Sequence, residues 1–227
     1  MNYIKTFEGF EGVKKTKKIL KHFSRGRGGV ESVIKNLSDK DGNINDLMEN
    51  LSKRFKVEKV KYMNAGAFGM AFIADDDKII KLTSQRSEAS EVRGLIGENT
   101  PGCVEYYDIV YSKKFDIYAI LMQKSDPITK KEKEIFDVFL ENDVNHFDKN
   151  QLNDLYKKKL GVTKEEFISY AKEFIDLKEK LEENNISTND LHPGNMGRVD
   201  GNLVHFDIMK GFTGENDLNK ISKIKLG

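Results

Sequence analysis

The sequence is poor in cysteine, tryptophan, proline and long apolar runs. Cys103 is the single cysteine among 227 residues, so a disulfide framework is excluded and a reducing compartment is expected. No apolar run approaches the roughly 20 residues that a membrane-spanning helix needs. The first ten residues, MNYIKTFEGF, lack the basic-then-apolar order of a secretion signal. We therefore expect a cytoplasmic protein with no membrane partner, whereas the missing tryptophan and the three prolines exclude nothing by themselves.

An excess of charge of one sign is also missing. The 38 Lys and Arg residues nearly balance the 37 Asp and Glu residues, and the formal net charge is +1. Such a balance gives no global attraction to nucleic acid or to a membrane surface, so nucleic acid is not an expected partner. Residues 1–27 are the exception, because eight basic residues stand there against two acids. A solvated helix face is the plain interpretation, and docking to a protein or nucleic acid is the alternative.

The first 54 residues are predicted to form a helical N-terminal extension. An amphipathic pattern covers residues 1–24, and the glycine-rich RGRGG follows it. Two short helical stretches come next, at about 30–38 and 44–54, separated by the turn DKDG. This extension is where we expect a protein partner to bind, if the basic helix has one.

Residues 55–124 predict an antiparallel sheet with one helix. Apolar and polar residues alternate in FKVEKVKYM, as they do in a half-buried strand, and three aspartates form a turn between two β-rich arms. Antiparallel pairing is the simplest connection for strands joined by short turns. The predicted elements are a strand at 55–63, arms at 70–74 and 78–83, a helix at 87–97 and two strands within 103–124.

Helices dominate the predicted third segment, residues 125–227. Thr129 with Glu132, and Thr163 with Glu166, have the spacing of capping boxes. The second box opens the clearest amphipathic helix of the chain, which should end near residues 184–185. A polar loop, STNDLHPGNMG, and a strand-like GNLVHFDIM follow it. The whole chain is thus predicted to be α+β.

Glycine and lysine in the predicted sheet could bind phosphate. Gly66 and Gly69 lie in NAGAFGMAF between two strands, where glycine lets backbone N–H groups approach an anion, although a structural hairpin explains them equally well. Lys81 is predicted to share a strand face with the apolar Ile79, and a lysine that faces inward needs an anionic partner. Glu88 and Glu91 on the following helix are both candidates, and we choose Glu91 because it precedes the apolar Leu95 by one turn.

The polar loop carries the second group of candidate residues. Asp190 and Asn195 are five residues apart in this loop, and Asp207 ends the strand-like segment that follows. Carboxylate and amide oxygens are ligands that suit Mg²⁺. A further carboxylate nearby can orient a hydroxyl and accept its proton. A phosphoryl-transfer site contains the same parts in the same order: a glycine loop, a strand lysine, a helix glutamate, an Asp-x4-Asn loop and an aspartate at the end of a strand.

This order resembles the protein-kinase-like superfamily over residues 55–212. DLHPGN at 190–195 is similar to the catalytic loop of the aminoglycoside and choline phosphotransferases and of small atypical prokaryotic or phage kinases. The resemblance implies a bilobal fold with an antiparallel-sheet N-lobe at 55–124 and a minimal helical C-lobe at 125–227. It also implies ATP and Mg²⁺ as cofactors and a protein or small-molecule hydroxyl as acceptor, in the host cytoplasm if the protein is viral.

Roles for single residues follow from the resemblance. Gly66 and Gly69 would belong to the nucleotide-binding loop, Lys81 would contact the α- and β-phosphates, and Glu91 would anchor Lys81. Asp190 would be the catalytic base, whereas His192 would only shape the loop. The hinge beside adenine would be Met122, Gln123 and Lys124, and the magnesium ligands would be Asn195 and Asp207.

The sequence also departs from the superfamily pattern. Asn64 stands where the first loop glycine is usual, and DIM replaces the DFG pattern after the strand. Twenty residues follow Asp207, too few for an activation segment, so an acceptor surface would come from residues 1–54, residues 127–162 or a partner. Two alternatives therefore stay open: a binding module that keeps the kinase architecture without catalysis, and transfer of another part of the nucleotide, such as adenylylation.

Overall fold

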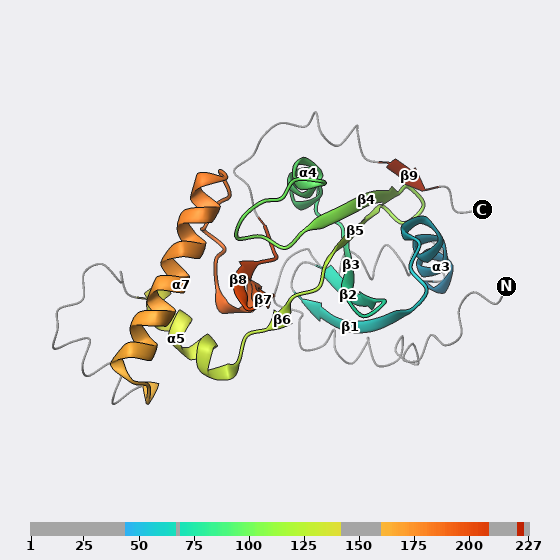
Figure 1. The fold of residues 1–227 in the computed structure, drawn as a ribbon. Coiled ribbons are helices and arrows are strands. Elements are labelled where there is room, and N and C mark those ends of the chain that lie inside the picture. Colours follow the sequence, from blue (N-terminus) through green and yellow to red (C-terminus); the bar gives the residue numbers. More distant parts are fainter. Residues whose placement is uncertain (1–43, 67–68, 142–159, 209–221, 225–227) are drawn as a thin grey trace. The chain divides into compact units, whose positions relative to one another are not determined.

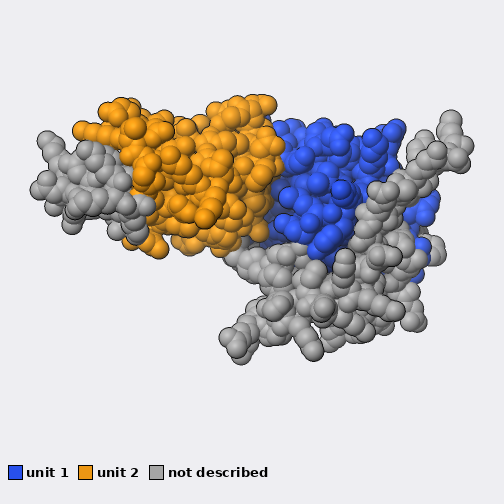
Figure 2. Space-filling model, turned by 90° about the horizontal axis from the view of Figure 1, so that it is seen from below, with its two compact units in different colours: residues 1–99, 105–124, 212–227 blue, residues 100–104, 125–211 orange. Residues whose placement is uncertain are grey.

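The structure of the protein is a computed structural model, which describes residues 44–66, 69–141, 160–208 and 222–224. The described residues fall into two compact units, coloured blue and orange in Figure 2. A sheet with two helices makes up the first unit, and the second is mainly helical with a small sheet. The predicted α+β class is therefore confirmed.

The first unit is built on a six-stranded sheet (Figure 1). Its strand order is β1-β2-β3-β5-β4-β9; the first five strands pair antiparallel, and β9 is parallel to β4. The elements are α3 (Ile44–Phe55), β1 (Val60–Gly66), β2 (Gly69–Ala74), β3 (Lys78–Thr83), α4 (Arg86–Leu95), β4 (Tyr106–Ser112), β5 (Ile117–Gln123) and β9 (Ser222–Ile224).

One face of this sheet packs against α3. Leu47, Met48 and Leu51 of α3 are fully buried in a cluster with Phe72 and Ile80 of the sheet. Burial of each such side chain contributes about 1.5–3 kcal/mol. The helix predicted over 44–54 is present, and its apolar residues complete the core of the first unit, so this part of the predicted extension is integral to the sheet.

Most predicted strands of the first unit are confirmed. The arms 70–74 and 78–83 correspond to β2 and β3, and the predicted helix 87–97 corresponds to α4. The strand predicted at 55–63 begins later, at Val60, because the chain is still helical up to Phe55. Its alternation is also interrupted, since the register of β1 against β2 shifts between Tyr62 and Asn64.

The second unit contains two helices (Figure 1), and their aromatic side chains form a shared core. Phe136 and Phe139 of one helix pack against Phe167 and Phe174 of the other at centroid distances of 5.1–5.9 Å, in stacked, edge-on and tilted arrangements. Both predicted capping boxes are present, with Thr129 and Glu132, and Thr163 and Glu166, exchanging backbone and side-chain hydrogen bonds. The helices are α5 (Lys130–Glu141) and α7 (Lys164–Glu183), the latter ending where the sequence predicts.

A small sheet with the order β6-β7-β8 completes the second unit. Its strands are β6 (Asp126–Pro127), β7 (Met196–Val199) and β8 (Asn202–His205), and the short 3₁₀ helix η3 (Pro193–Asn195) precedes β7. Asp200 and Gly201 turn the β7–β8 hairpin with φ values of 50° and 80°. A two-residue turn with positive φ at both positions matches strand twist and favours an Asp-Gly pair.

Two described segments lie in a different unit from the one predicted. Residues 100–104 belong to the second unit, where Gly102 accepts a hydrogen bond from the His205 N–H at 2.8 Å. Strand β9 comes from the predicted C-lobe, yet it pairs with β4 in the first sheet. The helices predicted over 1–24 and 30–38 lie outside the described residues. In the described part of the chain, no helix has the length and apolar character needed to cross a membrane.

Gly69 should be essential for the stability of the first sheet. A Cβ atom at Gly69 would collide with the Leu82 carbonyl oxygen of β3, a backbone atom that cannot rotate away. Gly69→Ala should therefore lower the free energy of unfolding by about 3 kcal/mol, in the range that overpacking causes. Chemical denaturation monitored by circular dichroism measures this loss.

Gly94 supplies the matched control. It lies within α4 with nothing within 4 Å of an added Cβ, so Gly94→Ala should raise stability by roughly 1 kcal/mol through helix propensity. Equal effects of the two substitutions would contradict the close approach of Gly69 to β3.

Candidate functional site

Lys81 forms a buried ion pair in the first unit. Its register partners on the neighbouring strands are Ala71 and Ile120, so it faces the side of the sheet opposite Ile80 and Leu82, which lie in the cluster with α3. The Lys81 Nζ atom lies 2.5 Å from the Glu88 Oε1 atom, and the two side chains are only 14% and 6% exposed. The predicted inward orientation of Lys81 is therefore present.

Glu88, the other acid that the sequence offered, is the partner that the structure shows for Lys81. It lies in the first turn of α4, directly after the loop that leaves β3. Glu91 is also buried on α4. Its predicted role as an anchor of Lys81 stays a prediction.

The two predicted loop glycines are a register pair. Gly66 ends β1 and Gly69 begins β2, and residues 67–68 between them lie outside the described residues. The close approach of Gly69 to the Leu82 carbonyl gives this glycine a structural reason that needs no ligand. A role of either glycine in phosphate binding stays a prediction.

The predicted hinge residues use their backbone N–H groups within the first unit. Met122 is buried in β5, and the next two N–H groups, of Gln123 and Lys124, donate to the carbonyls of Glu105 at 2.8 Å and Asp77 at 2.9 Å. The Lys124 Nζ atom also donates to a backbone carbonyl, that of Asp76, at 3.1 Å. A base bound beside this stretch would therefore contact carbonyl oxygens or side chains rather than the N–H groups of residues 123 and 124.

Asp190 and Asn195 are joined directly in the second unit. The Asn195 Nδ2 atom donates to the Asp190 Oδ2 atom at 3.0 Å and to the Asp190 carbonyl at 3.2 Å. Asn195 is only 7% exposed, whereas 27% of the Asp190 side chain is exposed. This arrangement fixes the amide with its nitrogen toward Asp190 and leaves its Oδ1 atom as the acceptor end.

His192 shapes this loop, as the resemblance implies. The His192 Nδ1 atom accepts a hydrogen bond from the Gly194 N–H at 3.0 Å and so caps the 3₁₀ helix η3. Its proton is therefore on Nε2, which lies 3.9 Å from the Asp190 Oδ1 atom. The Asn195 N–H closes the turn by donating to the His192 carbonyl at 2.8 Å.

Asp207 follows the same hairpin that Asn195 precedes. The Phe206 N–H donates to the Asn195 carbonyl at 3.0 Å, which extends the β7–β8 pairing by one step beyond Met196 and His205. Asp207 thus leaves the hairpin at the end where Asn195 enters it. The two side chains offer an amide oxygen and a carboxylate, the hard donors that Mg²⁺ accepts.

The donor set fits a metal that arrives with a nucleotide. Among the described residues, no group of three or more His, Cys, Asp and Glu side chains is arranged to hold an ion. Mg²⁺ at nucleotide sites is bound by one or two carboxylates together with phosphate oxygens, so a protein cage is not required. Asn195 and Asp207 would hold it here.

His205 is a buried histidine next to this site. Burial lowers its pKa to about 4, although the nearby Asp207 and Asp190 oppose the shift. His205 is fully buried, and neither ring nitrogen has a hydrogen-bond partner within the described residues. The ring is therefore neutral at pH 7 and adds no positive charge beside the two aspartates.

Arg198, which lies three residues after Asn195, has no recognisable signal in the sequence. Its guanidinium group contacts Glu132 and Glu173 on the two helices of the second unit. Only the capping-box position of Glu132 was visible in the sequence, because a pairing across 66 residues leaves no local pattern.

The predicted site residues form two groups. Lys81, its predicted partner Glu91, the two glycines and residues 122–124 belong to the first unit, whereas Asp190, Asn195 and Asp207 belong to the second. Their joint use of one nucleotide stays a prediction.

Coupling energies should show how strongly Glu88 and Glu91 each interact with Lys81. Lys81→Met should lower the free energy of unfolding by about 3–5 kcal/mol, because it leaves a buried carboxylate without its partner. Adding Glu88→Gln should recover part of that loss, whereas adding Glu91→Gln should recover less. Urea denaturation of the single and double variants gives both coupling energies, and a larger coupling to Glu91 would contradict the observed pair.

Comparisons with known proteins gave structural matches only. Neither a protein-family model nor a curated protein matches the chain. The streptomycin–ATP–APH(2″)-IIa ternary complex matches with a TM-score of 0.34 and 16% identity, over 73% of this chain and 72% of that one. Aminoglycoside phosphotransferase APH(4)-Ia matches with a TM-score of 0.40 and 10% identity, over 73% and 71% of the two chains.

ADP-bound aminoglycoside phosphotransferase APH(2″)-Ib is a third match, with a TM-score of 0.31, 16% identity and coverage of 73% and 72%. These three TM-scores lie below 0.5, so the matches carry no conclusion about the chemistry of this chain.

Proposed function

We propose that this chain is an ATP-dependent phosphotransferase that moves the γ-phosphate to a hydroxyl group with the help of Mg²⁺. The observation that carries the proposal is the hydrogen-bonded pair of Asp190 and Asn195, with Asp207 at the same end of the β7–β8 hairpin. A partly exposed carboxylate beside an oriented amide oxygen and a second carboxylate provides a base and two metal donors. The buried pair of Lys81 and Glu88 supports the proposal from the first unit.

Asp190 would act on the acceptor hydroxyl. Its carboxylate accepts the hydroxyl proton while the hydroxyl oxygen forms a bond to the γ-phosphorus, and the bond from that phosphorus to the bridging β-γ oxygen breaks to release ADP. Asn195 holds the Oδ2 atom of Asp190 by its hydrogen bond, which fixes the orientation of the base. Mg²⁺, held by Asn195 and Asp207 together with phosphate oxygens, would supply neutralisation of the developing phosphate charge.

Lys81 would bind the nucleotide. An ammonium group on a rigid strand can contact the α- and β-phosphates, and the ion pair with Glu88 restricts its position before the nucleotide arrives. The hairpin of Gly66 and Gly69 would lie against the phosphates, as the resemblance implies. The acceptor is a hydroxyl of a protein or of a small molecule, and the basic residues 1–27 are the place proposed for a protein partner.

Binding of Mg·ATP should stabilise the full chain. At a concentration 100-fold above Kd, a ligand that binds only the folded state adds about 2.7 kcal/mol. The melting temperature, followed by differential scanning fluorimetry, should therefore rise by several degrees, and the rise should be smaller for Lys81→Met. A chain that shows no shift with any nucleotide and Mg²⁺ would instead fit the binding-module alternative.

Substitution of Asp190 should remove turnover and leave binding intact. Asp190→Asn keeps an oxygen that can accept from Asn195 but is no longer a base, so transfer from γ-labelled ATP should fall about 10²–10⁴-fold. Nucleotide affinity should change little. The label is followed in the presence of Mg²⁺, alone and with lysate as a source of acceptors, beside the inactive reference Asp207→Ala.

The matched control is Asp200→Asn. Asp200 lies in the exposed hairpin turn with φ of 50°, a conformation that asparagine also adopts, so this variant should keep full activity. Undiminished transfer by Asp190→Asn would remove Asp190 from its proposed role. Transfer of AMP rather than phosphate would be recognised by the mass added to the acceptor.

A further inference from the structure

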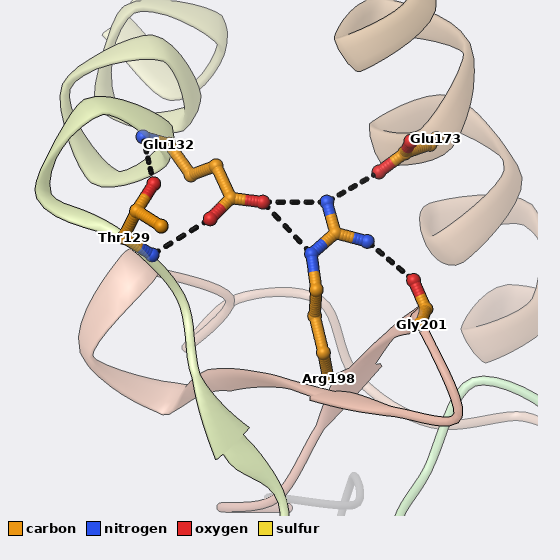
Figure 3. Close-up of polar contacts among 5 residues, drawn as sticks. All are labelled: Thr129, Glu132, Glu173, Arg198 and Gly201. Atoms are coloured by element: carbon orange, nitrogen blue, oxygen red, sulfur yellow. Dashed lines mark hydrogen bonds and ion pairs between the residues drawn. The ribbon is translucent and has the colours of Figure 1, made fainter.

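Arg198 binds three partners that come from different parts of the second unit (Figure 3). The Nε and Nη2 atoms lie 2.8 and 2.6 Å from the Glu132 Oε1 atom, and Nη2 also donates to the Glu173 Oε2 atom at 2.7 Å. The Nη1 atom donates to the Gly201 carbonyl at 2.6 Å. One guanidinium group thus joins β7, the hairpin turn, α5 and α7.

Glu132 is itself fixed by a second set of hydrogen bonds. Its Oε2 atom accepts from the Thr129 N–H at 2.7 Å, and its N–H donates to the Thr129 Oγ1 atom at 3.2 Å (Figure 3). The carboxylate that binds Arg198 is therefore also the carboxylate of the capping box that begins α5. Because each oxygen has its own donor, the side chain of Glu132 has little freedom to follow a moving hairpin.

The charges of this network persist in spite of burial. Burial alone would raise the pKa of Glu132, but hydrogen bonds from Thr129 and Arg198 outweigh it and lower the pKa. Burial alone would lower the pKa of Arg198, but Glu173 and Glu132 outweigh it and raise the pKa. Both groups stay ionised at neutral pH, and their contacts keep the directional geometry of charged hydrogen bonds.

Stability alone is a weak explanation for this network. Desolvation offsets much of the Coulomb attraction in a buried ion pair, and apolar residues of similar volume often stabilise a fold as well or better. A planar guanidinium with three fixed acceptors instead defines one orientation of the strand that carries it. Position is therefore what Arg198 adds that an apolar residue could not.

The strand held in this way leads directly to the site. Arg198 contacts the turn end of the β7–β8 hairpin through Gly201, and Asn195 and Asp207 leave the opposite, open end. The side chains of a strand alternate between faces, so a slip of one residue in the hairpin would turn its flanking residues away from their partners. Fixing one end of a hairpin whose strands are only four residues long restricts the register at the other end.

We propose that Arg198 is a positioning residue that locks the β7–β8 hairpin to α5 and α7, so that Asn195 and Asp207 present their oxygen atoms to one Mg²⁺ ion. The proposal rests on the proposed function, because it assigns Arg198 to the metal half of that site. It predicts that substitution of Arg198 weakens nucleotide binding in the presence of Mg²⁺. The nucleotide affinity that Lys81 contributes without Mg²⁺ should stay unchanged.

The experiment compares nucleotide affinity with and without Mg²⁺. A non-hydrolysable ATP analogue is titrated calorimetrically into the full chain, once with EDTA and once with saturating Mg²⁺. For the wild type, Mg²⁺ should tighten binding. For Arg198→Lys, whose single ammonium cannot reach all three partners, that tightening should fall about tenfold, the lower end of the loss seen when support of a metal ligand is removed. The Kd with EDTA should stay unchanged.

Two further variants separate position from stability. Glu132→Gln keeps an oxygen for the Thr129 N–H but removes the charge opposite Arg198, so it should reproduce the effect of Arg198→Lys. Phe139→Leu weakens the aromatic core by removing ring contacts with Phe167 and Phe174 of α7, so it should lower the melting temperature and leave the effect of Mg²⁺ unchanged.

The outcomes are distinguishable. A wild-type effect of Mg²⁺ that Arg198→Lys retains in full would overturn the positioning role and leave the proposed function intact. Equal weakening with EDTA and with Mg²⁺, or the same loss in Phe139→Leu, would also overturn it, since general destabilisation would then suffice. A wild-type chain that binds no analogue under either condition would overturn the proposed function and the positioning role together.

Discussion

The hydrogen bonds from Asn195 to Asp190 are the interaction on which the candidate site depends. An amide has a donor end and an acceptor end, and burying it against the Asp190 carboxylate and carbonyl decides which end faces outward. The backbone of Asn195 is held as well, by the His192 carbonyl on one side and the Phe206 N–H on the other. These hydrogen bonds hold the loop in one conformation directly before the β7–β8 hairpin.

Both units place an ion pair where an apolar residue would pack. Lys81 with Glu88 lies on a strand face among apolar neighbours, and Arg198 with Glu132 lies between a strand and a helix. Such pairs add little net stability, but they are directional, because a misplaced partner leaves a buried charge. Lys81 is itself proposed to contact the nucleotide, and Arg198 lies on β7, the strand that follows Asn195. The fold thus has buried ion pairs where the orientation of a side chain matters, although their desolvation opposes folding. Aromatic packing is found where orientation matters less.

Local patterns predicted much of the fold, and pairings between distant segments account for the differences. Three short-range signals correspond to features of the structure. They are the two capping boxes, the acidic turn between β2 and β3, and the spacing of Asp190 and Asn195, whose side chains are hydrogen-bonded. That Glu88 lies beside Lys81 depends on the rotation of α4 against the sheet, which residue spacing does not specify. Arg198 and Glu132 are 66 residues apart, so no window of sequence relates them.

The pairing of β9 with β4 bears on how the chain folds during synthesis. Strand β4 forms one edge of an antiparallel sheet whose other members are complete once residue 123 has been made. Its covering strand, Ser222–Ile224, leaves the ribosome about a hundred residues later, which is several seconds at ordinary translation rates. During that interval the hydrogen-bonding edge of β4 is available to other chains. The nascent protein therefore passes through a stage at which a chaperone or rapid translation would protect it from aggregation.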